Sequence, residues 1–152
     1  MSTSAYEVLH PERDLSCVLF ASPHSGRDYA WSFMRTTVLD DYVIRSSEDA
    51  FVDLLFEAAP EFGASFIRAG APRAYVDLNR AVDELDPALI EGVRRQRHNP
   101  RVASGLGVIP RVVANGRAIY RGKISRAEAE QRNNDIWRPY HRVLQSLLDK
   151  AH

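Results

Sequence analysis

Residues 17–22, Cys-Val-Leu-Phe-Ala-Ser, form a continuous apolar run that ends at Pro23 and Gly26. An unbroken apolar run of this length, bounded by turn residues, is typical of a buried strand in a parallel sheet. Such a strand needs cover on both faces, so this run favours an α/β sheet packed against helices. The loop that follows leaves the carboxyl end of the strand, where open α/β sheets place their ligands.

The chain up to residue 78 predicts one helix and two further strand segments. A helix is expected from Ser47, because apolar residues then recur at helical spacing, and it is expected to close at Pro60 and Gly63. Short strands are expected at 64–70 and 73–78, either as successive strands or as one broken strand.

The rest of the chain predicts a helix, a hairpin and a second helix. The first helix is expected over 86–99. The pair Asn115-Gly116 between two apolar runs predicts a hairpin. A long helix is expected from Ser125 almost to the end of the chain, and Pro139 is expected to break or kink it.

Length and charge limit the domain organisation and the partners. The 152 residues fit one domain, residues 1–152, whose order of elements predicts a mixed sheet flanked by helices in three layers. Twenty basic and twenty acidic residues balance, so we expect no nucleic-acid partner. No stretch reaches the roughly 18 apolar residues of a membrane span, and the single cysteine, Cys17, indicates a reducing compartment. We therefore expect a cytoplasmic protein without a membrane partner.

His24 lies in the loop after the first predicted strand, within the sequence Pro-His-Ser-Gly-Arg. This place suits a metal ligand or a catalytic residue. A lone histidine after a strand is, however, more often structural, so the residues alone leave both interpretations open.

Two later groups of polar residues suit the same chemistry. Glu48 and Asp49 stand at a predicted helix start, where acids stabilise the helix dipole, but a carboxylate near a histidine also makes a zinc pair. Asp77, Asn79 and Arg80 follow a predicted strand. Arginine and asparagine suit a carboxylate ligand, although an aspartate-arginine pair at a strand end is commonly a salt bridge.

A basic segment near residue 100 has no interleaved aromatic residues. A solvated helix face, or a lid over an anionic substrate, is therefore favoured over a nucleic-acid site. The segment contains Arg94, Arg95, Arg97, His98 and Arg101.

Several motifs occur in a fixed order between about residue 18 and about residue 149. They are "SPHSGR", "SEDAFVDLLF", "RAYVDLNR", "ELDP", "GLGVIPRV", "IYRGKIS" and "WRPYHRVL". This ordered set resembles the N-formylglutamate amidohydrolase family, which is similar to the zinc carboxypeptidases and aspartoacylases. The resemblance implies a phosphorylase/hydrolase-like, zinc carboxypeptidase-like fold.

The resemblance also implies a metal site. It assigns zinc, or another divalent metal, to His24 and Asp49, with Glu48 as the fallback for the second ligand. In the wider group the first ligand motif is His-x-x-Glu, whereas Arg27 stands at the position of that glutamate.

By the same resemblance, Asn79 and Arg80 hold the carboxylate of the substrate. Arg27 and Arg73 are candidates to polarise the scissile carbonyl or to contact a second carboxylate. The implied reaction is hydrolysis of a small acidic N-acyl amino acid, N-formylglutamate, to formate and glutamate by a zinc-activated water.

Two ligands are fewer than the roughly three that catalytic zinc takes from a protein. Family members continue beyond the "PYH" helix into a strand that is expected to carry the third ligand. We therefore expect a fragment or a truncated member of the family. The alternative is that another residue, His98 or His141, substitutes for the third ligand.

A competing hypothesis is a non-catalytic module that binds an acidic small molecule. Its ligand-binding residues would be Arg27, Arg73 and Arg80. The sequence leaves the acyl group, the general base and the oligomeric state open.

Overall fold

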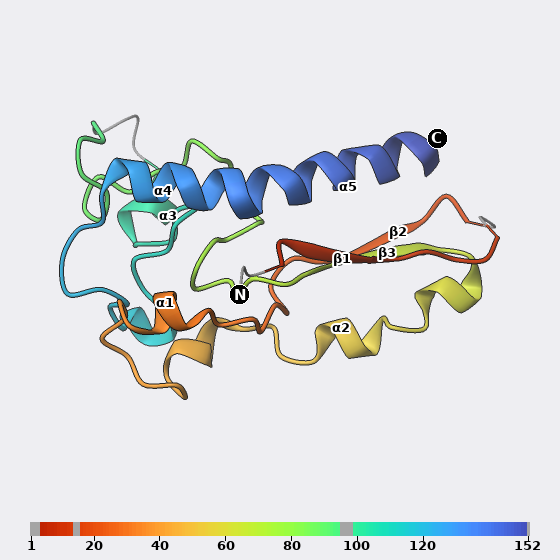
Figure 1. The fold of residues 1–152 in the computed structure, drawn as a ribbon, viewed down its shortest axis with the longest axis horizontal. Coiled ribbons are helices and arrows are strands. Elements are labelled where there is room, and N and C mark those ends of the chain that lie inside the picture. The colour runs from red at the N-terminus through yellow and green to blue at the C-terminus, as the bar shows by residue number, and fades with distance from the viewer. Residues whose placement is uncertain (1–3, 14–15, 95–98, 152) are drawn as a thin grey trace.

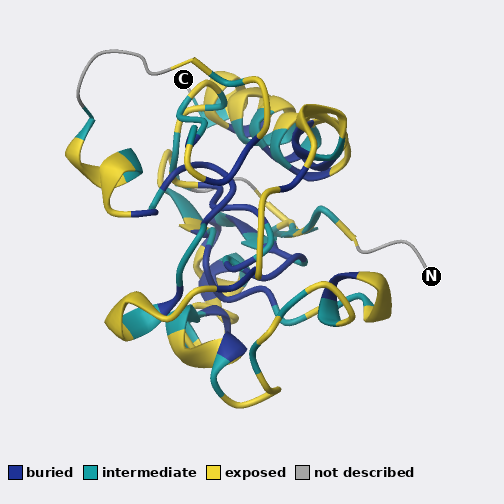
Figure 2. Cartoon of the chain, turned by 90° about the vertical axis from the view of Figure 1, so that its left-hand side faces the viewer, coloured by how far each residue is buried: buried dark blue, intermediate teal, exposed yellow. Residues whose placement is uncertain are grey.

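The computed structural model describes residues 4–13, 16–94 and 99–151 and has a mixed α/β fold. Figure 1 shows a small sheet between a long C-terminal helix on one side and short helical segments on the other. In Figure 2 the buried segments run through the middle of the molecule, and the outer helices carry most of the exposed residues. The predicted α/β class, with a mixed sheet flanked by helices, is therefore confirmed.

The sheet has three strands in the order β1-β3-β2. The central strand β3 (Ser65–Ala69) pairs antiparallel with β1 (Tyr6–Leu9) and parallel with β2 (Leu19–Ser22). Phe66 and Ile67 of β3 are both fully buried. Consecutive residues of a strand point to opposite faces, so both faces of β3 are covered.

The apolar run at 17–22 forms the edge strand β2, which confirms the first predicted strand, and 64–70 contains β3. The strand expected at 73–78 is wrong. The amides of Tyr75 and Val76 bond back to the carbonyl of Pro72, so the chain turns there instead of extending. The strand-like composition of this segment is therefore overridden by local turn hydrogen bonds.

The helix expected from Ser47 is divided into shorter pieces. The 3-10 helix η1 (Ile44–Ser47), the helix α2 (Val52–Leu55) and the 3-10 helix η2 (Ala59–Phe62) follow one another. Phe51 has a positive φ of 65°, which no continuous helix accommodates. Gly63 ends η2 in the left-handed region, as its place in the sequence predicts.

The helix expected over 86–99 is also wrong for the residues described there. Asp86 caps a short turn by accepting the amide of Ala88, and the segment then makes a single parallel bridge from Ile90 to Ile124. Residues 95–98 lie outside the described ranges. Helix α3 (Pro100–Ala103) begins only after Asn99, whose side chain caps it.

The expected hairpin is reduced to one antiparallel bridge, between Val112 and Ala118, around the 3-10 turn η3 (Ala114–Gly116). Asn115 and Gly116 both have positive φ, which is the property that makes this pair a turn former.

The long C-terminal helix is confirmed, but Pro139 does not break it. The helix consists of α4 (Arg126–Arg132), the π-helical segment η4 (Asn133–Trp137) and α5 (Arg138–Ala151). Pro139 comes just after the π-helical segment η4, so the helix passes this proline through a local π-helical distortion instead of ending there. Within the described ranges no helix is long and apolar enough to cross a membrane.

Gly26 packs directly against the chain that follows β3. A Cβ at this position would lie 2.0 Å from the carbonyl oxygen of Ala71 and 2.8 Å from that of Gly70. The amide of Asp28 also donates to the Gly70 carbonyl at 3.0 Å. The loop after β2 is therefore fixed against the loop after β3, which brings the polar residues of the two loops together.

We expect Gly26→Ala to lower the free energy of unfolding by about 3 kcal/mol or more, because the new methyl group meets backbone rather than a movable side chain. Gly122→Ala is the matched control, since a Cβ there has no atom within 4 Å. Urea denaturation of both variants measures the difference. Equal stability of the two variants would contradict the close packing.

Candidate active site

His24 lies two residues beyond β2 and is buried, with 6% of its surface exposed. Each of its ring nitrogens faces a carboxylate. Nε2 is 2.7 Å from Oδ1 of Asp77, and Nδ1 is 3.3 Å from Oδ2 of Asp49. The structure therefore brings the histidine of the first loop together with acids from two other segments of the chain.

Asp49 is held beside His24 by the backbone. Its amide donates to the carbonyl oxygen of His24 at 3.1 Å, while half of its side chain, 51%, remains exposed. Glu48, the fallback ligand, is turned elsewhere. It accepts a hydrogen bond of 2.6 Å from the hydroxyl of Tyr29 and pairs with Arg45 at 3.2 Å. Burial, together with this carboxylate, raises the pKa of Tyr29.

Asp77 is 1% exposed and is the most heavily bonded residue of the site. Its Oδ1 accepts from Nε2 of His24 and from the amide of Asn79 at 2.9 Å. Its Oδ2 accepts from Nε of Arg73 at 3.1 Å and lies 3.8 Å from Nε of Arg80. Burial raises the pKa of Asp77, but the hydrogen bond and charge of His24 and the charge of Arg73 lower it further, so the net shift is downward. The group is therefore a carboxylate at neutral pH.

The contact between Asp77 and His24 was not predicted from the sequence. The sequence groups Asp77 with Asn79 and Arg80, as part of a carboxylate-binding segment or of a salt bridge with arginine, whereas the structure makes it the partner of His24 as well. One feature of the sequence indicates this contact. Asp77 follows β3 in the chain, as His24 follows β2, so both residues are expected at the same end of the sheet.

The arginine candidates divide into two groups. Arg73 and Arg80 both lie against Asp77, and Nε of Arg80 is buried without a hydrogen-bond partner. Arg27 instead forms two hydrogen bonds, of 3.2 and 2.7 Å, with the buried carboxylate of Asp53. Among the described residues, Arg27 makes no ion pair with the acids beside His24. The structure therefore gives Arg27 a structural partner and leaves Arg73 and Arg80 at the site.

Of the two substitute ligands named from the sequence, only His141 lies among the described residues. His141 bonds through Nε2 to the carbonyl oxygen of Leu78 at 2.9 Å. His98 lies outside the described residues. Asn79 is exposed, and its amide rather than its side chain makes the recorded contact with Asp77.

A pocket of about 420 Å³ opens beside this cluster. Its lining includes the charged residues Asp49, Arg73 and Asp77. It also includes the apolar residues Leu106, Pro110, Val112, Val113 and Ala114. A molecule that has charged groups and a short hydrocarbon chain would match such a lining.

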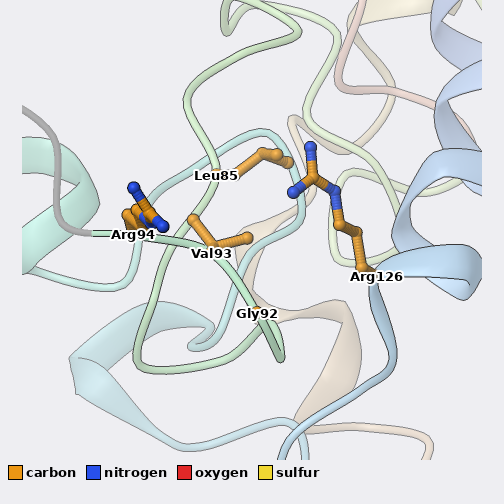
Figure 3. A pocket seen from close by; sticks show the side chains of 5 residues that line it. All are labelled: Leu85, Gly92, Val93, Arg94 and Arg126. Carbon is orange, nitrogen blue, oxygen red and sulfur yellow. The ribbon is translucent and has the colours of Figure 1, made fainter.

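A second pocket, of about 230 Å³, is shown in Figure 3. It is lined by Leu85, Gly92, Val93, Arg94 and Arg126. The two arginine side chains come from separate segments, and Arg94 belongs to the basic run noted in the sequence. This pocket contains no residue of the His24 cluster.

Two of the donors around His24 have a separation that is compatible with shared binding of one metal ion. Two ligands bound at about 2.0–2.1 Å to a tetrahedral zinc are about 3.3 Å apart. Nδ1 of His24 and Oδ2 of Asp49 have this separation, 3.3 Å. The carboxylate of Asp77 is hydrogen-bonded to the other ring nitrogen, Nε2. Carboxylates commonly orient metal-binding histidines in this way. In the part of the chain that the structure describes, no group of three or more histidine, cysteine and acidic residues forms a complete metal site.

The chain matches known proteins over nearly all of its length. The family described as N-formylglutamate amidohydrolase matches residues 16–152. A protein of Pseudomonas aeruginosa named N-formylglutamate deformylase is 28% identical over 145 residues, which are 93% of this chain and 49% of the relative. A protein of the same name from Pseudomonas putida is 25% identical over 135 residues, covering 88% of this chain and 45% of the relative.

The solved structures show the same similarity. The crystal structure of N-formylglutamate amidohydrolase from Ralstonia eutropha superimposes with a TM-score of 0.89 at 33% identity, covering 97% of this chain and 53% of that one. A gene product of Agrobacterium tumefaciens has the same fold, with a TM-score of 0.67 at 15% identity, covering 97% and 50%. The chain thus spans about half the length of the relatives that it matches.

We expect Asp77→Asn to lower the free energy of unfolding by about 2–4 kcal/mol, because it leaves the buried arginine charges unpaired. Asp49→Asn should change it by about 0.5 kcal/mol or less, because this side chain is half exposed. Urea denaturation at pH 7 compares the two isosteric substitutions. Similar losses of unfolding free energy in the two variants would mean that Asp77 does not organise the site.

Proposed function

Because the chain belongs to the N-formylglutamate amidohydrolase family, we propose that it carries the first part of the active site of an enzyme that hydrolyses N-formylglutamate. One observation carries the proposal: the buried His24 lies between Asp77 and Asp49 at the edge of a pocket that also contains Arg73. The position of this cluster at the carboxyl end of β2 also supports a zinc carboxypeptidase-like arrangement of the sheet.

His24 and Asp49 are the residues that we propose to hold zinc, or another divalent metal. The bound metal would supply a water activated at neutral pH and would polarise the scissile carbonyl. With a metal bound, Asp77 would fix the ring of His24 by accepting the hydrogen of Nε2, which would leave the lone pair of Nδ1 for the metal between His24 and Asp49.

Arg80 and Asn79 are proposed to bind one carboxylate of the substrate, and Arg73 the other. Nε of Arg80 has no hydrogen-bond partner in its buried position, so a carboxylate ligand would satisfy a donor that the protein leaves free. In the reaction, water adds to the formyl carbon and the carbon-nitrogen bond breaks. The nitrogen takes up a proton, and formate and glutamate are released.

The third metal ligand is proposed to come from a strand that pairs with β2. Strand β2 lies at the edge of the described sheet, and its residues Leu19–Ser22 include no charge or proline to prevent pairing. A parallel strand added there would bring its own carboxyl end next to His24.

The competing proposal, a non-catalytic module for an acidic ligand, differs in its need for metal. Calorimetry with N-formylglutamate, with and without a chelator, separates the two. Metal-dependent formate release supports the hydrolase. Binding that is indifferent to chelator, without formate release, supports the module.

We expect His24→Ala to abolish stoichiometric zinc binding and to lower formate release by at least about 100-fold, because the substitution removes a metal ligand. His10→Ala, at an exposed histidine in the N-terminal segment, is the matched control. Metal analysis and a formate assay measure both effects. Normal zinc content and activity in the His24 variant would refute the assignment.

A further inference from the structure

Two aromatic side chains of the C-terminal helix bond to the backbone of the turn at residues 78–80. Trp137, the last residue of η4, donates from its indole nitrogen to the carbonyl oxygen of Arg80 at 2.8 Å. His141, one turn later in α5, bonds through Nε2 to the carbonyl oxygen of Leu78 at 2.9 Å. A carbonyl only accepts, so Nε2 carries the hydrogen. The helix therefore holds the two carbonyl groups on either side of Asn79.

The two rings also support each other. Their centroids are 3.9 Å apart with an angle of 29° between the planes, a stacked pair at the spacing i, i+4. Tyr140 meets the ring of His141 edge-on at 5.4 Å. Burial lowers the pKa of His141, so the ring is neutral at pH 7. Both donors are thus kept in a fixed orientation by packing.

The turn itself has few internal restraints. The amide of Arg80 donates to the backbone carbonyl of Asp77 at 3.2 Å, and the amide of Asn79 donates to the Asp77 carboxylate. Asn79 is exposed. Both restraints come from Asp77, the residue before the turn, whereas the bonds from His141 and Trp137 reach its first and last residues, Leu78 and Arg80.

We propose that Trp137 and His141 are positioning residues that hold the turn at residues 78–80 in the shape that a substrate carboxylate requires. The benefit to binding rests on the function proposed above, in which Asn79 and Arg80 grip that carboxylate. A turn fixed before binding does not lose conformational freedom when the ligand arrives, so the affinity is higher.

Hydrogen exchange tests the restraint without reference to activity. Trp137→Phe and His141→Phe keep an aromatic ring but remove the donor. We expect the amides of Asn79 and Arg80 to exchange about 5- to 10-fold faster in each variant, the effect of one lost hydrogen bond. His141→Gln, which restores a donor, should return the exchange toward that of the original protein.

Two substitutions of the same chemical type are the controls. Trp31→Phe changes a tryptophan that is 73% exposed, and His10→Phe changes an exposed histidine. Neither should alter exchange at residues 78–80.

Steady-state formate release then tests the role in binding. The two ring variants should raise KM for N-formylglutamate by about 5- to 10-fold and change kcat by less than about 2-fold, because a looser turn weakens binding alone. The glutamine variant should recover most of the lost affinity.

The outcomes separate this inference from the proposed function. Unchanged exchange at Asn79 and Arg80, or faster exchange throughout the chain, overturns the inference. Faster exchange confined to the turn, in a protein that neither binds nor hydrolyses N-formylglutamate, supports the restraint and refutes the proposed function. If exchange is faster only in the turn and KM is unchanged, the role in binding is refuted.

Discussion

The site depends on one buried carboxylate, Asp77. An unpaired charge in the interior is costly, so a buried aspartate has to be surrounded by donors. Here the donors are a histidine from the loop after β2, an arginine four residues earlier, and the backbone of its own turn. Satisfying this single group therefore fixes the relative positions of the segments that carry His24 and Arg73.

The sheet and the C-terminal helix make that arrangement possible. The parallel pairing of β2 with β3 brings the chain after each strand to the same edge of the sheet, and Gly26 allows the two backbones to touch there. The amide of Asp77 donates to the carbonyl of Val108 at 2.8 Å, which ties the start of the turn to a fully buried residue of the core. The C-terminal helix also holds the turn, because Trp137 donates to the carbonyl of Arg80.

The sequence pattern correctly predicted the helices and strands whose formation depends on interactions between residues that are close in the chain. The apolar run forms β2, and the side chain of Ser125 caps α4 by accepting the amide of Glu128, so each of these elements is specified within a few residues. The failures have non-local causes. Residues 73–78 have strand-like composition, but Pro72 turns the chain, and the contact of His24 with Asp77 joins residues 53 positions apart. The partner of Arg27, which is a candidate site residue by the family resemblance, is likewise set by a non-local contact, with Asp53.

The charge balance of the proposed site would favour a substrate with two negative charges. Arg73 and Arg80 balance Asp49 and Asp77, and a histidine that binds metal is neutral. A divalent metal bound as proposed would therefore leave two uncompensated positive charges at a pocket that is lined in part by apolar residues. A dicarboxylate would neutralise both charges, whereas a monocarboxylate would leave one unpaired. Because an unpaired charge away from water is costly, such a balance would select for the second carboxylate even before any specific contact is considered.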